Sequence, residues 1–105
     1  MRMHTANELN TLANILAADG TTVLASNVAA GIEDLSGRRL EQAQLSAPET
    51  SHMILFRALD AILLTEAGYV SISGVSYIVD YFIDPRNPRV GVWKEVYCHA
   101  EKVGS

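Results

Sequence analysis

The stretch Ser76–Cys98, SYIVDYFIDPRNPRVGVWKEVYC, reads as two apolar strands on either side of a polar loop. Pro85 and Pro88 remove two backbone donors from its middle, so the segment between the strands cannot lie inside a sheet. On both sides of that segment, aliphatic and aromatic residues recur at every second position, which is the period of a half-buried strand. The stretch therefore predicts two neighbouring β-strands near the end of the chain.

Alternation also predicts which side chains share a face of each strand. In the second strand, Val96 and Cys98 alternate with aromatic and polar residues. In the first strand, Ile78 and Phe82 interrupt the polar face. We expect the rest of the first strand to divide into an apolar face, Val75, Tyr77, Val79, Tyr81 and Ile83, and a polar face, Ser76, Asp80 and Asp84.

Outside this pair, four more segments have the composition of strands. TLANILA, residues 11–17, also has helical spacing, but the turn signal Asp19-Gly20 behind it favours a hairpin and hence a strand. Either a short helical turn or an apolar bend fits ALDAILLTEAG, residues 58–68. About six strands joined mostly by short turns predict an all-β, mainly antiparallel fold, either a small β-barrel or a sandwich. The other three segments are VLASNVAAGIEDL (23–35), SHMILFRA (51–58) and YVSISG (69–74), where Gly74 predicts a tight turn.

Residues 36–50, SGRRLEQAQLSAPET, break the strand pattern, because apolar density falls and Gly37 and Pro48 mark the ends. A loop of this length is long for a compact domain, where connections have a median of about 4 to 6 residues. Such loops are usually either functional or disordered, so this one is a candidate functional region. Its basic pair, Arg38-Arg39, is either a recognition site or simply a solvated loop tip. The candidate contact residues are Arg38, Arg39, Glu41, Gln42 and Gln44.

Length and composition place the chain among small folded domains. The 105 residues are enough for one domain, spanning residues 1–105, and a hydrophobic content of 49% argues against intrinsic disorder. The net charge of −4 argues against direct binding of nucleic acid. Cys98 is the only cysteine, so no intramolecular disulfide can form. We expect neither a signal peptide nor a membrane segment, and therefore folding in a cytoplasm.

The residues that could carry chemistry do not form a local site. Cys98, His99 and Glu101 could be combined as metal ligands, but neighbouring strand residues point to opposite faces, so Cys98 and His99 cannot easily share one ion. Asp80 and Asp84 would lie roughly 13 Å apart along a strand, too far to act on one bond. No recognised nucleophile, phosphate-binding or metal motif occurs. We expect no catalytic, cofactor-binding or metal residue, and no enzymatic activity.

The outward face of the last strand carries Trp93, Tyr97 and His99. Aromatic side chains on a solvent-facing strand often contact another chain, because they supply a large area at low entropic cost. The alternative is a small satellite core beneath a loop. The sequence leaves both interpretations open, and these three residues are the candidate inter-subunit contact.

Several segments, taken in order, resemble one family. AAGIEDLSGRRLEQAQ is similar to its strand that runs into LSGRE-like residues before a long loop, and SHMILFR to its H-x-I-x-x-R segment. ISGVSYIVDYFIDPRNPRVGVWKEVYC resembles its G-x-x-Y-x-V/I strand, Asp-Pro turn and final strand. Over residues 28–100 the chain resembles the head–tail connector proteins of tailed bacteriophages, also called head closure, joining or adaptor proteins. It departs from them in residues 1–27 and in TEAG, which lacks their Thr-Pro-Gly.

The resemblance implies a structural virion protein. Its subunits would form a ring, a hexamer or dodecamer, beneath the portal or adaptor protein and above a tail terminator or tail protein. The long loop would face the channel or a neighbouring ring, and DNA would pass through without specific binding. The location would be the virion neck, after assembly in the host cytoplasm, in a phage, a prophage or a gene transfer agent. The alternatives are a tail terminator or tail-completion subunit, and a small β-barrel module that binds a ligand or peptide.

Overall fold

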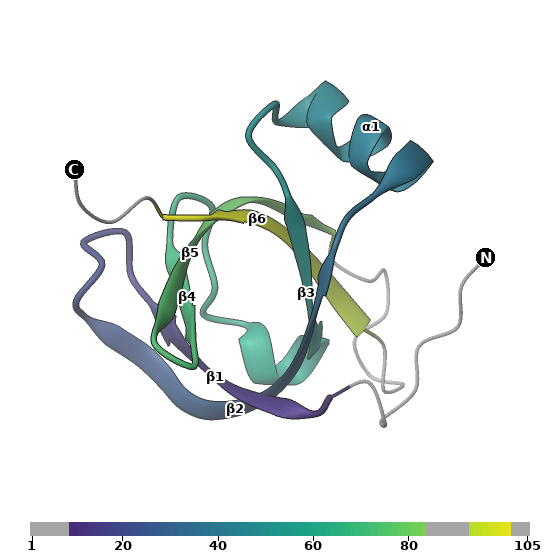
Figure 1. Ribbon diagram of the computed structural model, residues 1–105. Helices are drawn as coiled ribbons and strands as arrows, with labels where there is room; N and C mark the ends of the chain where they lie inside the picture. The colour runs from purple at the N-terminus through teal and green to yellow at the C-terminus, as the bar shows by residue number, and fades with distance from the viewer. Residues whose placement is uncertain (1–8, 84–92, 102–105) are drawn as a thin grey trace.

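The computed structural model describes residues 9–83 and 93–101, which form a closed six-stranded antiparallel β-barrel (Figure 1). The strands are adjacent in the order β1-β2-β3-β6-β5-β4, and β1 pairs with β4 to close the sheet. The predicted all-β class is thus confirmed, and of its two forms the barrel is the one observed. The elements are β1 (Thr11–Leu16), β2 (Val23–Asp34), α1 (Gly37–Ser46), β3 (His52–Arg57), the 3₁₀ turn η2 (Ala58–Ala61), β4 (Tyr69–Ile72), β5 (Val75–Ile83) and β6 (Trp93–Ala100).

Two tight turns lie where the sequence predicts them. Between β1 and β2, the Asp19 carboxylate accepts hydrogen bonds from the backbone N–H of Thr21 and Thr22, at 2.9 and 2.8 Å. Between β4 and β5, Ser73 and Gly74 both have positive φ, 51° and 82°. Positive φ at both central residues characterises the two-residue turn whose twist matches that of the flanking strands. These turns set the register of their hairpins.

The prediction that residues 36–50 form a loop is wrong in one respect, because this segment contains the ten-residue helix α1. Most residues of GRRLEQAQLS are good helix formers, and Leu40 and Ala43, three positions apart, lie on one face. Ala43 is buried against the barrel. The sequence does not reveal the helix because a short polar segment with a single small buried residue shows little apolar periodicity. The predicted helical turn at residues 58–68 is confirmed by η2.

The predicted division of faces in β5 is also wrong beyond Val79. Val79 pairs with Cys98, but Tyr81 rather than Asp80 pairs with Tyr97, so the strand holds one extra residue at this bulge. An extra residue moves every later side chain to the opposite face. Asp84 lies outside the described residues. Tyr77, Val79 and Phe82 therefore pack with the main core, whereas Tyr81 stacks on Tyr97 outside the barrel.

The main core fills the barrel, and η2 contributes to it. Lys94, only 3% exposed, donates a hydrogen bond from Nζ to the carbonyl oxygen of Ala61 at 2.9 Å, and its Nζ lies 4.1 Å from the centre of the Phe82 ring. The carbonyl oxygen of Ala61 and the face of the Phe82 ring both stabilise the buried positive charge of Lys94. The buried members of this core are Ala13, Ile15, Val28, Ala30, Ile54, Phe56, Ala61, Leu64, Val70, Ile72, Val79, Val96 and Cys98.

A second, smaller core lies outside the barrel, between α1 and the strand pair β3–β6. Leu35, Ala43, Met53 and Leu55 are its buried members. Because β3 contributes to both cores, all four of its central residues are buried. Figure 1 shows α1 standing outside the barrel, next to the strands that it joins. Among residues 9–83 and 93–101, no helix is long and apolar enough to cross a membrane.

The main core gives a direct test of the fold. Ile54 is fully buried in the barrel, whereas Ile62 is 66% exposed. We expect Ile54→Ala to lower the free energy of unfolding by about 2–5 kcal/mol, through lost apolar burial and the cavity left behind. Ile62→Ala is the matched control, expected to change stability by no more than about 0.5 kcal/mol. Chemical denaturation measures both, and equal losses would contradict the assignment of the core.

Candidate functional site

The five candidate residues of the predicted loop lie on α1. Arg39 forms an ion pair with Glu33 at the end of β2, and Gln44 donates a hydrogen bond from Nε2 to the carbonyl oxygen of Thr50 at 3.1 Å. Arg38, Glu41 and Gln42 are exposed. The helix is therefore attached to the barrel by Ala43 and Leu40, which pack on the second core, and by the polar contacts of Arg39 and Gln44.

The candidate contact residues of the last strand, Trp93, Tyr97 and His99, do not form one exposed surface. Trp93 and Tyr97 are partly buried and pack against the second core under α1, which is the satellite-core arrangement with a helix in place of a loop. The Tyr97 ring stacks on Tyr81, with centroids 4.7 Å apart and planes 10° apart. Its hydroxyl donates to Glu95 Oε1 at 2.9 Å. His99 belongs instead to a separate polar network. Contact of Trp93, Tyr97 or His99 with another chain therefore remains a prediction, and the three residues do not form one shared surface.

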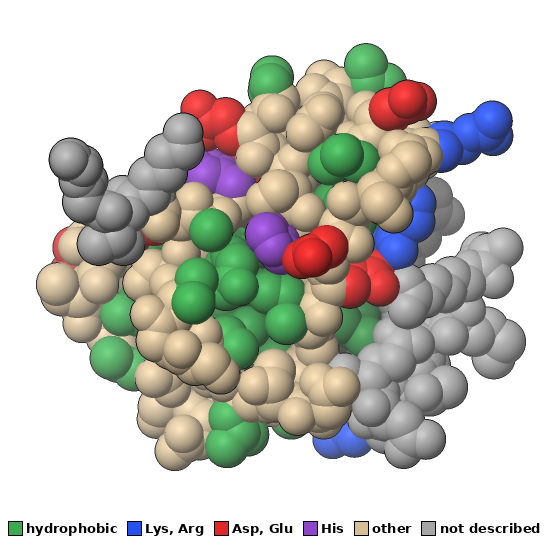
Figure 2. All heavy atoms as spheres, in the orientation of Figure 1, with side chains coloured by type: hydrophobic (Ala, Val, Ile, Leu, Met, Phe, Trp, Pro, Cys, Tyr) green, Lys and Arg blue, Asp and Glu red, His purple; other side chains and the backbone are tan. Residues whose placement is uncertain are grey.

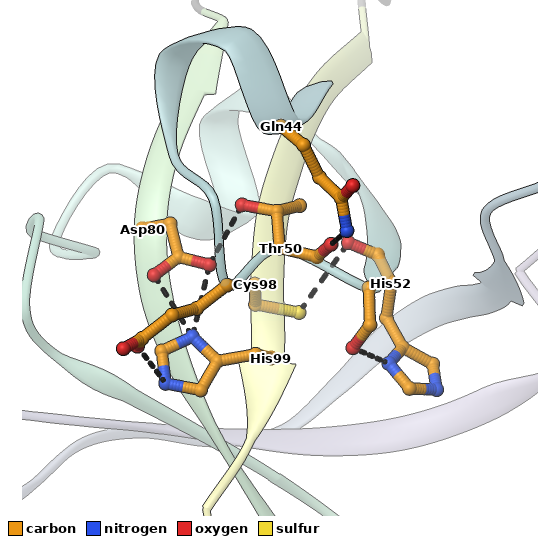
Figure 3. Close-up of polar contacts among 8 residues, drawn as sticks. Gln44, Thr50, His52, Asp80, Cys98 and His99 are labelled. Carbon is orange, nitrogen blue, oxygen red and sulfur yellow. Dashed lines mark hydrogen bonds and ion pairs between the residues drawn. The ribbon is translucent and has the colours of Figure 1, made fainter. Parts of the chain in front are cut away.

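The His99 network joins three segments of the chain (Figure 3). His99 Nδ1 lies 2.9 and 3.0 Å from the two carboxylate oxygens of Asp80, and Nε2 lies 3.3 Å from Glu49 Oε2. The buried hydroxyl of Thr50 donates to Asp80 Oδ2 at 2.8 Å. The Asp80 side chain is only 11% exposed and that of Glu49 is 77% exposed. The network thus runs from a sheltered carboxylate, through an imidazole, to a carboxylate in solvent.

A second network surrounds His52 at the start of β3. Its Nδ1 lies 2.7 Å from the hydroxyl of Ser51, its Nε2 lies 2.8 Å from Asp34 Oδ1, and its ring meets that of Tyr77 edge-on at 5.3 Å. Serine, histidine and aspartate in a row also occur in hydrolases. Here, however, the Ser51 N–H is bound to the carbonyl oxygen of Cys98, and the Asp34 side chain is 87% exposed. Asp34 is therefore not the sheltered acid that orients the histidine in such hydrolases.

Cys98 and His99 point to opposite faces of β6, as strand geometry predicts. Cys98 is completely buried in the main core, and its thiol lies 3.8 Å from the carbonyl oxygen of His52. Burial raises the pKa of the Cys98 thiol well above its usual range, and the nearby Asp80 carboxylate adds to this rise. A thiol that stays protonated is neither a nucleophile nor a metal ligand.

The described residues that could hold a metal ion are Glu49, Asp80 and His99, whose ligand atoms lie within 4.8 Å of one another. The sequence indicates Asp80 and His99 as residues whose convergence with each other or with His52 would favour an enzyme, whereas nothing in it indicates Glu49. No local signal could have joined residues so far apart in sequence. An open pocket of about 710 Å³ adjoins the cluster and is lined by Glu49, Ser51, Ile78, His99, Ala100 and Glu101.

Figure 2 shows the face onto which the barrel opens in the view of Figure 1. Apolar side chains gather at the mouth of the barrel, and histidine and acidic side chains border them. Basic side chains lie toward the edge of this view. The face therefore combines an apolar centre with histidine and acidic side chains on part of its border.

Comparison with known proteins does not assign the chain to a family. No protein-family model matches it, and no curated protein matches it at a significant level.

Attachment of α1 can be tested through Ala43, which is 2% exposed. Ala43→Asp would place a carboxylate against Met53 and Leu55, so we expect it to destabilise the protein by about 2 kcal/mol more than Gln42→Asp on the exposed face. The fluorescence of Trp93, the only tryptophan, should shift to the red in Ala43→Asp alone. Similar spectra and stabilities for the two variants would contradict the packing of α1 on the barrel.

The environment of Tyr97 predicts a dependence on alkaline pH. Burial, followed by the Glu95 carboxylate that accepts its hydrogen bond, raises the pKa of Tyr97 to about 12 from a model-compound value of 10.0. Because folding favours the protonated phenol, its contribution to stability is present below pH 10 and is lost as the pH rises through about 12. In the Tyr97→Phe variant, the part of the loss of stability that comes from Tyr97 should be absent. Chemical denaturation at a series of pH values from 10 to about 12 measures it. An unchanged decline would contradict the assignment.

Proposed function

We propose that this chain is a structural subunit of the neck of a tailed-phage particle. It would join a hexameric or dodecameric ring below the portal or adaptor, close the DNA-filled head and offer a surface to the tail. The proposal rests on the sequence resemblance to head–tail connector proteins, and the observation that carries it in the structure is a pattern of exposed apolar side chains suited to ring contacts.

The first part of this pattern lies at η2 and just beyond it. Leu59, Ile62 and Leu63 are 61%, 66% and 56% exposed. Three large apolar side chains within five residues are costly to leave in water, and such groups commonly mark contacts with another protein. We call this group the η2 patch.

The second part lies on α1, where Leu45 is 88% exposed near the end of the helix. Helix α1 packs on the outer face of β3 and β6, whereas η2 contributes Ala61 to the core inside the barrel. The two apolar groups therefore belong to different surfaces. A closed ring is built from head-to-tail contacts, which require two different surfaces on each subunit.

The closed barrel is compatible with this role because the sheet formed by the described strands has no free edge. A subunit without a free edge cannot join its neighbours by adding strands to that sheet, so side chains on its outer surface must provide the contacts. Many weak contacts of this kind act together around a ring. No catalytic role is part of the proposal.

Two other functions stay open. A tail terminator or tail-completion subunit would use the same surfaces on the tail side of the neck. A small β-barrel binding module is favoured by one observation, the open pocket of about 710 Å³ beside His99. Such a module would bind a ligand or peptide as a monomer and would not require a particle.

Electron microscopy of particles made without this gene tests the neck proposal. We expect separate tails beside heads that have lost DNA, because an unclosed head neither retains its genome nor binds a tail. Complete particles in the absence of the gene would overturn the proposal and favour the binding module.

Two complementing variants make this test specific to the η2 patch. Ile62→Asp places a charge in the patch, whereas Thr65→Asp places the same charge on a nearby exposed polar residue. We expect the first variant to fold but to leave heads and tails separate, and the second to restore complete particles. Full complementation by Ile62→Asp would show that the patch is not a ring contact.

A further inference from the structure

His99 lies between two carboxylates, one at each ring nitrogen. A neutral imidazole has only one N–H, so it can donate to only one of them and presents a lone pair to the other. A lone pair that faces a carboxylate oxygen is repulsive unless a positive charge lies between them. A cation bound between Nε2 and the Glu49 carboxylate would supply that charge, and the ligand atoms of Glu49, Asp80 and His99 lie within 4.8 Å of one another.

His52 provides an internal comparison, because both of its ring nitrogens are satisfied without added charge. The Ser51 hydroxyl can donate to Nδ1 at 2.7 Å, and the Nε2–H can donate to Asp34 at 2.8 Å. One donor and one acceptor are what a neutral imidazole requires. The arrangement around His99 is therefore a specific feature of that site.

The distances around His99 are those expected for a histidine that binds a metal ion through one ring nitrogen and donates a hydrogen bond to a carboxylate from the other. Asp80, at 2.9 Å from Nδ1, is placed to accept the Nδ1–H, and Thr50 holds the Asp80 carboxylate. This leaves the Nε2 lone pair facing Glu49 at 3.3 Å. With metal–ligand bonds of about 2.1 Å, two atoms separated by that distance subtend about 104° at the ion, close to the tetrahedral angle. Metal-binding histidines commonly donate their other N–H to a carboxylate.

We propose that His99 Nε2 and the Glu49 carboxylate bind a divalent transition-metal ion of the zinc class, with Asp80 as the positioning residue. The remaining ligand positions would face the open pocket, which Glu101 also lines. The imidazole ligand favours zinc, cobalt or nickel over magnesium and calcium, which prefer oxygen ligands. The ion would tie the segment after α1 to β6 of the barrel, a property independent of the proposed role in the neck.

Isothermal titration of the purified, tag-free full chain with ZnCl₂ tests this site. We expect one ion to bind per chain, with MgCl₂ giving no binding. The exposed Glu49 makes Glu49→Gln a variant that keeps the fold, and it should weaken zinc binding at least about tenfold, as should His99→Gln. His52→Gln is the matched control and should leave the affinity unchanged.

Asp80→Asn separates positioning from folding. Loss of a supporting carboxylate lowers metal affinity by about 10- to 100-fold. The visible absorption of bound Co²⁺, which reports tetrahedral coordination, should weaken in this variant, whereas a purely structural role would change only the unfolding midpoint.

Two outcomes would overturn the metal site. Absence of zinc binding by the wild-type chain at neutral pH would show that these residues do not form a metal site. Equal zinc affinity in the wild type and His99→Gln would place the ion elsewhere. Neither outcome bears on neck assembly, which particle microscopy tests separately.

Discussion

The structure depends on the pairing of β6 with both β3 and β5. β6 lies between these strands in the barrel, and its side chains alternate between the two cores. Val96 and Cys98 fill the barrel, whereas Trp93 and Tyr97 support α1 from outside. Closure of the sheet by β1 and β4 then leaves the described strands without a free edge. The described barrel therefore has side chains and the segments between its strands for contact with another molecule.

The bulge at Asp80 links this architecture to the polar site. Because Asp80 is the extra residue in β5, it has no partner in the register with β6, and its carboxylate reaches His99 and Thr50. The same bulge turns Phe82 toward the main core and Tyr81 toward Tyr97. One irregular residue thus builds the His99 network and the aromatic pair under α1. Bulges often redirect side chains near functional sites in this way.

Because the polar segment between β2 and β3 forms helix α1, its side chains have fixed positions on the outside of the barrel. A flexible loop would adapt to a neighbour, whereas a helix held by Ala43, Arg39 and Gln44 presents a fixed set of side chains. The segment after it, which carries Glu49 and Thr50, is held between the helix and the barrel. In the proposed ring, such preorganisation would reduce the entropy lost on assembly.

The sequence by itself determined the strands, because an apolar period of two, the Asp19-Gly20 signal and Gly74 act through local geometry. It also determined that Cys98 and His99 point apart. Local patterns predicted neither the bulge in β5, which appears only against a partner strand, nor α1, whose one buried residue is small. Only the tertiary structure selected the barrel over the sandwich and brought Glu49, Asp80 and His99 together. The physical reason is that these outcomes arise from contacts between segments distant in sequence, whose energies no local pattern contains.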